Sequence, residues 1–298
     1  NSPVPDEVWC NGWFIDPGVL VDDDGRVYIY CGFERSFMAE VSQNMYEISG
    51  DTVIEHIIPI VPDKEHGFAE EESLFFEACS PRKIYGTNYL IYSPKQGSRL
   101  AYATSDKPTG PFTYRGYIVD NGVDYPGGND HGSVTCINGQ WYIFYHRMTN
   151  GTIMSRRGCV ERIEILPDGT IPPVEMTSLG FEETLNPYEI TPADIACVLK
   201  GGATIIEKNV FERVIINITD GCEIGYKYYD FGDDFTGKNM EFSADIIGCG
   251  CDCTVRIFAD DEEIGSFDVG RNGGIITCPV KCVTGRHALY LKVSSPYS

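Results

Sequence analysis

Three acidic residues stand at one repeated distance ahead of an aromatic stretch. Each precedes a tyrosine by 12 residues: Asp16 precedes Tyr28, Glu77 precedes Tyr89 and Asp130 precedes Tyr142. Carboxyl groups that meet in one pocket can divide the work of a general acid and a general base, because a neighbouring anion favours the protonated form of one of them. The alternative for each residue is a turn cap at the start of a strand, where Asp is common. That alternative is weakest for Glu77, which follows two phenylalanines and is not a turn former.

The three tyrosines belong to a repeated pattern. A glycine turn followed by an aromatic strand occurs in residues 25–30, 86–92 and 139–145, and the corresponding tyrosines are 61 and 53 residues apart. Each interval holds about four short strands, which is the size of one β-propeller blade. The innermost strands of a propeller surround its axis, so equivalent positions of successive blades converge there. We therefore expect the carboxylates at these positions to face one another.

The composition excludes several classes of function. The chain has 298 residues, 42% of them apolar and 12% aromatic, which predicts a globular protein of two domains. A net charge of -21 repels phosphate groups, so we expect no nucleic-acid partner, and no apolar run is long enough to cross a bilayer. The 12 cysteines lack the tight spacing of a disulfide framework. Reduced thiols favour a cytoplasmic location, with secretion left open.

The longer motifs resemble a known family. Residues 14–25, 75–84, 129–133 and 141–147 together resemble the third, fourth and fifth blades of family 43 glycoside hydrolases. The resemblance extends from about residue 13 to about residue 180. It implies an all-β chain in which residues 1–190 form a partial five-bladed β-propeller consisting of its last three blades. It also implies hydrolysis with inversion of configuration, by direct attack of water and without an organic cofactor.

The same resemblance assigns roles to two of the carboxylates. It implies that Glu77 is the general acid and that Asp16 is the carboxylate that orients and tunes this acid. An inverting enzyme also needs a general base, with the two carboxyl groups about 6.5–9.5 Å apart. In the family the base lies on the first blade, whereas residues 1–13 run almost directly into the third-blade motif. We therefore expect this chain to be a fragment, with an N-terminal fragment of the same protein supplying the base.

Four further residues are candidates for substrate contact. The resemblance places His131 near the propeller axis, beneath the sugar, where the family often holds calcium, although a lone histidine is commonly structural. Calcium prefers several oxygen ligands, so water would have to complete its shell there. Arg156 resembles an arginine that reaches the bound sugar, and its alternative is a surface ion pair. Trp13 and Phe14 could form an apolar wall against a sugar, or pack in the core.

The pattern changes after residue 190. Short alternating strands are expected around residues 204–206, 214–218, 240–246, 254–258 and 287–293, which is typical of a jelly-roll β-sandwich. Residues 220–232 and 284–291 resemble a family 6 carbohydrate-binding module, so residues 191–298 are predicted to form a second domain. Ile275 follows the Gly273-Gly274 turn, where such modules present an aromatic ring. Cys249, Cys251 and Cys253 alternate along a strand and are interpreted as buried apolar residues rather than metal ligands.

The sequence therefore predicts an enzyme that acts on plant cell-wall oligosaccharides. The expected activity is the release of terminal arabinofuranosyl groups from hemicellulose such as arabinoxylan, because an axial pocket suits removal of terminal sugars. A β-xylosidase acting on xylo-oligosaccharides is the alternative within the same class. A non-catalytic carbohydrate-binding or scaffold fragment is the alternative from another class.

Overall fold

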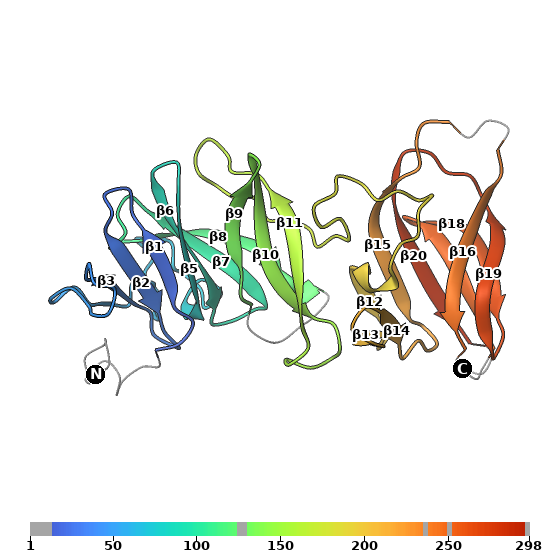
Figure 1. Ribbon diagram of the computed structural model, residues 1–298, viewed down its shortest axis with the longest axis horizontal. Helices are drawn as coiled ribbons and strands as arrows, with labels where there is room; N and C mark the ends of the chain where they lie inside the picture. Colours follow the sequence, from blue (N-terminus) through green and yellow to red (C-terminus); the bar gives the residue numbers. More distant parts are fainter. Residues whose placement is uncertain (1–13, 124–129, 235–237, 249–251, 296–298) are drawn as a thin grey trace. The chain divides into compact units, whose positions relative to one another are not determined.

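The computed structural model describes residues 14–123, 130–234, 238–248 and 252–295 (Figure 1). The chain divides into two compact units. The first comprises Asn1–Arg147 and Gly158–Glu175, and the second comprises Met148–Arg157 and Met176–Ser298. The second unit thus includes a short segment, Met148–Arg157, that lies before the end of the first in sequence. The main segment of the second unit begins at Met176, ahead of the domain boundary predicted at 190/191. That domain boundary stays a prediction.

Three antiparallel sheets follow one another in the first unit (Figure 1). All three run through their strands in chain order, as propeller blades do. The all-β prediction, with blades of a propeller followed by a sandwich, is confirmed. The strands of the three sheets are, in turn, β1 (Gly18–Val21), β2 (Val27–Cys31), β3 (Phe37–Val41) and β4 (Ile54–Glu55); β5 (Phe75–Ile84), β6 (Thr87–Pro94), β7 (Arg99–Ser105) and β8 (Thr113–Asp120); and β9 (Ser133–Ile137), β10 (Gln140–Met148) and β11 (Arg156–Ile163).

The middle strands of the second sheet explain the repeated aromatic pattern. Strands β6 and β7 are buried along almost their whole length, so both of their faces are covered. Tyr89 and Tyr102 stack with ring centroids 6.2 Å apart, and each phenol reaches the segment that follows β11. Tyr89 donates to the Gly169 carbonyl at 2.6 Å, and the Tyr102 oxygen accepts from the Ile171 amide at 2.8 Å. All three repeated tyrosines are buried, and the phenol of Tyr89 in addition fastens a crossing segment.

Two hairpins of the first unit use the same tight turn. Tyr85-Gly86 joins β5 to β6, and Asn138-Gly139 joins β9 to β10, each as a two-residue loop. All four residues have positive φ, namely 51° and 87° in the first loop and 51° and 84° in the second. A turn of this kind requires left-handed backbone at both central residues, which Asn-Gly adopts readily.

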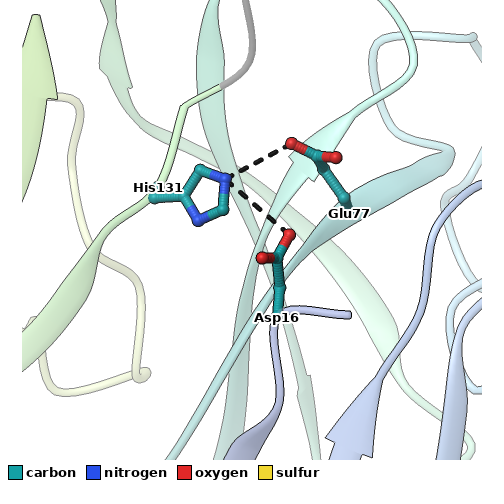
Figure 2. A group of neighbouring side chains, drawn as sticks. All are labelled: Asp16, Glu77 and His131. Atoms are coloured by element: carbon teal, nitrogen blue, oxygen red, sulfur yellow. Dashed lines mark hydrogen bonds and ion pairs between the residues drawn. The ribbon is translucent and has the colours of Figure 1, made fainter. Parts of the chain in front are cut away.

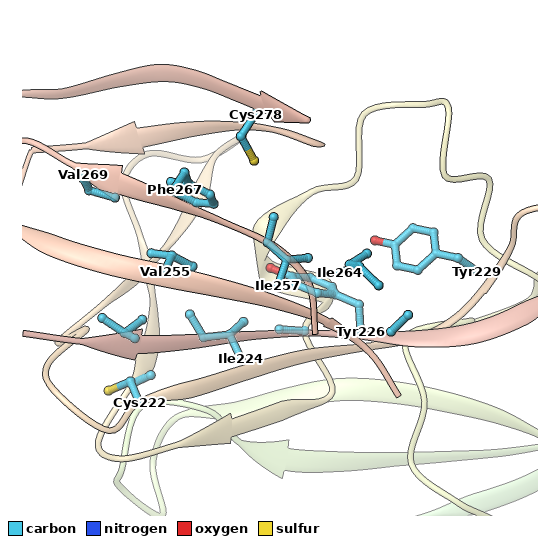
Figure 3. Packing of buried hydrophobic residues seen from close by; sticks show 14 of the residues in the cluster. Cys222, Ile224, Tyr226, Tyr229, Val255, Ile257, Ile264, Phe267, Val269 and Cys278 are labelled. Carbon is cyan, nitrogen blue, oxygen red and sulfur yellow. The ribbon is translucent and has the colours of Figure 1, made fainter. Parts of the chain in front are cut away.

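The second unit contains two sheets that face one another across an apolar core (Figure 3). Phe242 of the smaller sheet stacks on Phe267 of the larger one with ring centroids 5.8 Å apart, and Cys278 and Cys253 pack against the same core. Cys249 and Cys251 lie outside the described residues. The larger sheet has the order β12 (Val198–Lys200), β15 (Glu223–Asp230), β20 (Arg286–Ser294), β17 (Cys253–Ala259) and β18 (Glu262–Val269), and the smaller pairs β16 (Met240–Ile247) with β19 (Gly273–Val280).

A separate hairpin completes the second unit. It pairs β13 (Thr204–Glu207) with β14 (Arg213–Ile216), and the amide of Ile205 donates to the carbonyl of Thr149 at 2.9 Å. The segment Met148–Arg157, which links β10 to β11, is thereby fastened to this unit. In the described part of the chain the helical elements are the short turns η1 (Asn121–Val123) and η2 (Ala193–Ile195), and neither could cross a membrane.

Candidate active site

Glu77 lies near the start of β5, where the pairing of this strand with β6 is irregular. The pairing of β5 with β6 shifts on both sides of Glu77, which lies opposite Ser93, and the next residue, Ala78, has a φ of +67°. A bulge of this kind bends a strand and redirects the side chain it carries. Glu77 is only 5% exposed, so its carboxyl group is largely removed from bulk water. The local backbone therefore holds the carboxyl group of Glu77 in a buried position near the start of β5.

Asp16 reaches Glu77 because β1 and β5 approach closely at a glycine. A Cβ atom at Gly18 would lie 2.3 Å from Cδ of Pro81 and 2.4 Å from the carbonyl oxygen of Cys79. Only glycine fits there. Because β1 lies so close to β5 at this point, Asp16, two residues earlier, is brought beside β5. Asp16 itself has a φ of +51°, a conformation that Asp tolerates better than most residues.

His131 completes the cluster from the third sheet (Figure 2). Its Nε2 atom lies 3.3 Å from Oε1 of Glu77 and 3.8 Å from Oδ2 of Asp16. One ligand atom from each of the three residues lies within 4.8 Å of the others. The next residue is again a glycine at a close approach, because a Cβ atom on Gly132 would lie 2.3 Å from Cδ1 of Leu100. The three sheets thus contribute one side chain each to a single point.

The third position of the repeat was predicted wrongly. Asp130, not His131, is the residue 12 positions before its tyrosine, yet the cluster contains His131. Asp130 is 2% exposed, and its Oδ1 atom accepts a hydrogen bond from Nδ2 of Asn121 at 2.6 Å. The carboxyl group of Asp130 is therefore bound to Asn121, whereas the imidazole of His131 lies beside Glu77 and Asp16.

The donor set determines which ions suit the cluster. It offers two carboxylate groups and one imidazole nitrogen. Calcium favours six to eight oxygen ligands, whereas a mixed nitrogen and oxygen set suits ions such as zinc better. A calcium ion at His131 would have to draw most of its ligands from water. These three side chains offer few ligands to calcium. A structural calcium at His131 stays a prediction.

Of the other three predicted contact residues, the structure describes Arg156 and Phe14. Arg156 is exposed, its Nε donates to the carbonyl of Ile153 at 3.3 Å, and it belongs to the second compact unit. Phe14 is half-buried two residues before Asp16, and Trp13 lies outside the described residues. The substrate-binding roles of Arg156, Phe14 and Trp13 stay predictions.

Sequence reasoning missed an aromatic neighbour of the acid. Phe33, in the turn between β2 and β3, packs against Phe76 with ring centroids 5.0 Å apart. The amide of Glu34 donates to the carbonyl of Phe76 at 2.7 Å, so this turn is fixed directly beside Glu77. Phe75 is fully buried whereas Phe76 is half-buried, which is the alternation of a strand. Two consecutive phenylalanines do not show in the sequence which of them is buried, nor that Phe33 packs against the second.

Sequence comparison identifies the family of the chain. Residues 3–171 match the description "Glycosyl hydrolases family 43", and the chain belongs to this family. A "Xylosidase/arabinosidase" of Thermoclostridium stercorarium is 40% identical over 72% of this chain and 54% of its own length. An "Arabinoxylan arabinofuranohydrolase" of Bacillus subtilis is 27% identical over 93% of this chain and 60% of its own. The chain therefore spans little more than half the length of these relatives.

Comparison with solved structures gives a match across most of this chain. It is a family 43 arabinoxylan arabinofuranohydrolase from Bacillus subtilis in complex with cellotetraose. The two proteins are 24% identical over 95% of this chain and 64% of the other, with a TM-score of 0.48.

Proposed function

We propose that this chain carries the acid half of an inverting glycoside hydrolase site. Glu77 gives its proton to the glycosidic oxygen as the bond from that oxygen to the anomeric carbon breaks. A water oxygen bonds to the anomeric carbon from the opposite face, and a general base takes the proton that this water loses. The observation that carries the proposal is the convergence of Glu77, Asp16 and His131 from three sheets.

The surroundings of Glu77 suit a proton donor. Glu77 is the less exposed of the two carboxyl groups, with 7% of its side chain accessible against 28% for Asp16. In our proposal Glu77 is the proton donor and Asp16 is the carboxylate that orients it. His131 fixes the positions of both carboxyl groups and contacts the sugar.

The general base is proposed to come from another part of the same protein. An inverting site needs room for a water molecule, so the base and Glu77 would have their carboxyl groups about 6.5–9.5 Å apart. An N-terminal segment of the protein, separate from the described residues, would supply this carboxylate. Hydrolysis is then a property of the assembled protein.

The favoured substrate is a terminal arabinofuranosyl group on plant hemicellulose such as arabinoxylan. Two arabinoxylan arabinofuranohydrolases, from Bacillus subtilis and Paenibacillus polymyxa, match 93% and 94% of this chain. A β-xylosidase of Xylanibacter ruminicola matches 54% of it. The arabinose-releasing relatives thus share both compact units, which favours arabinofuranosidase over β-xylosidase. We further propose that the second unit is a module of the family 6 carbohydrate-binding type, although Ile275, 78% exposed, offers no ring for stacking.

The test is a Glu77→Gln variant of the whole protein, with Glu70→Gln as the matched control because Glu70 is exposed. Release of arabinose and of xylose from arabinoxylan is measured, and the anomer formed first is identified by proton NMR. We expect loss of hydrolysis only in Glu77→Gln, inversion in the wild type, and arabinose as the main product. Full activity of Glu77→Gln, or retention of configuration, would overturn the proposal. A wild-type protein that binds arabinoxylan without cleaving it would favour a scaffold role instead.

A further inference from the structure

A pair of aromatic side chains, the exposed Tyr85 and the half-buried Trp141, lies at the far end of the strand that carries the acid. Tyr85 follows the last residue of β5 and is 81% exposed, whereas Glu77 lies near the first. The two residues are eight positions apart along the chain, which is roughly 26 Å at the rise of an extended strand. The ring of Tyr85 meets that of Trp141, at the start of β10, with centroids 6.1 Å apart and planes at 79°. This pair is too distant from Glu77 to take part in the reaction.

The two rings are held in fixed positions. Nε1 of Trp141 donates a hydrogen bond to the phenol oxygen of Tyr85 at 3.0 Å. The sheets that carry them are joined nearby, because Arg82 donates from Nε to the carbonyl of Val134 and from Nη2 to Oγ of Ser133. Preorganised rings lose little conformational freedom when a ligand stacks on them. The cross-strand partner of Trp141 is Cys136, a small and exposed residue.

The turn that presents Tyr85 is an unfavourable place for a tyrosine. The equivalent two-residue turn of the next sheet contains Asn138 at the same φ of +51°, and asparagine is among the residues that this turn favours. A bulky side chain in left-handed backbone is a genuine outlier. Asn138 shows that a residue better suited to this turn is used in the next sheet. The presence of tyrosine at position 85 therefore indicates that its side chain has a function of its own.

We propose that Tyr85 and Trp141 form a secondary binding platform for an uncharged polysaccharide chain. The C–H bonds on one face of a pyranose ring form an apolar surface that stacks on an aromatic ring, while hydroxyl groups at its edge stay in water. The net charge of -21 disfavours polyanionic partners, so a neutral glycan is the matching ligand. The choice of hemicellulose as that glycan rests on the proposed function. The platform would hold the polymer to the enzyme while Glu77 acts on a different part of it.

The experiment measures binding without turnover. Whole protein carrying Glu77→Gln is titrated against insoluble arabinoxylan, with and without Tyr85→Asn. Asn suits the turn, so the fold is kept, and its melting temperature is expected to equal or exceed that of the parent. Loss of one stacked ring is expected to weaken binding about fivefold. Tyr85→Phe keeps the ring and is expected to stay within about twofold of the parent.

Tyr46→Asn is the matched control, because Tyr46 is equally exposed at 84% but belongs to another loop. It is expected to bind like the parent. The proposal is overturned if Tyr85→Asn binds arabinoxylan as tightly as the parent, or if Tyr46→Asn weakens binding equally. Binding is measured separately from cleavage. Failure of the platform would appear as unchanged binding by Tyr85→Asn, whereas failure of the hydrolase proposal would appear as full activity of Glu77→Gln.

Discussion

The two compact units bury different kinds of side chain. Among the described residues, every buried carboxylate, histidine and arginine belongs to the first unit: Glu77, Asp130, His146, Arg147 and Glu161. In the second unit the buried polar residues are Thr149 and Ser178, neither of which carries a charge. The core of that unit is built from aliphatic, aromatic and cysteine side chains.

The two units therefore differ in the free-energy cost of the polar side chains that they bury. Burying an ionisable group costs free energy unless hydrogen bonds or opposite charges offset the loss of water. The first unit meets that cost at several positions, and one of them is the acid of the proposed site. The second unit avoids the cost altogether, so its stability rests on apolar burial.

The largest effect is expected at the reacting cluster. Asp16→Asn removes the anion beside Glu77 without changing its size, and we expect hydrolysis of arabinoxylan by the whole protein to fall about 10³-fold, or about 4 kcal/mol in activation free energy. The fold should be unaffected, because Asp16 is only partly buried. Asp51→Asn, an exposed substitution elsewhere in the first unit, should leave the rate unchanged. Equal rates for Asp16→Asn and the wild type would remove Asp16 from the mechanism.

The next effect is expected in the sandwich core. Ile257 is fully buried there, so Ile257→Ala should lower the free energy of unfolding by about 3 kcal/mol through lost burial and a residual cavity. The three tryptophans, at positions 9, 13 and 141, all belong to the first unit. Urea unfolding followed by circular dichroism should therefore shift more than unfolding followed by tryptophan fluorescence. A shift of equal size by both probes would show that the two units unfold together.

A smaller loss is expected from the buried polar network of the first unit. The side chain of Asn121, 2% exposed, donates from Nδ2 to Oδ1 of Asp130 at 2.6 Å and to the carbonyl of His146 at 2.7 Å. Asn121→Ala removes both bonds from buried acceptors, so we expect a loss of about 2 kcal/mol in the free energy of unfolding. Here tryptophan fluorescence should report the change. A variant as stable as the wild type would mean that water replaces the amide.

The smallest effect concerns pH and the second unit. Hydrogen bonding to Asp260 raises the pKa of His287, whose Nδ1 lies 2.7 Å from Oδ2 of that residue. A raised pKa means that the stabilisation is complete below the unfolded value of about 6.5 and is lost as pH rises through the folded value. We expect a loss of less than about 1 kcal/mol between pH 6 and pH 8.5, because the partly exposed pair is screened. Asp260→Asn should reduce this dependence of the free energy of unfolding on pH, measured by urea unfolding at several pH values. An unchanged dependence would show that other groups cause it.

Much of this arrangement follows from local sequence signals. The glycine turns, the repeated tyrosines and the alternating strands of the second unit predicted the order of the elements correctly. The meeting of Glu77 with Asp16 was predicted from their equal distance to the following tyrosine, and the structure brings them together. These features depend on periodicity and spacing, which a single sequence records.

The remainder depends on contacts between distant segments. Equal spacing selected Asp130, but the direction of a side chain depends on strand alternation and on partners such as Asn121, which no spacing records. The extension of Met148–Arg157 into the second unit depends on its bond to Ile205, more than 50 residues later. Tyr85 did carry a signal in the sequence, because it stands before glycine where the matching turn has Asn138.

The segment Met148–Arg157 has a consequence for how this architecture could be rearranged. The chain passes between the two compact units three times, at 147/148, 157/158 and 175/176. A module joined by a single linker can be exchanged by one recombination event or released by one proteolytic cut. A junction at 175/176 would leave the carbonyl of Thr149 without the Ile205 amide, and Arg157 without Glu207, which lies 3.4 Å from it. A chimera that exchanges the second unit must therefore transfer Met148–Arg157 as well.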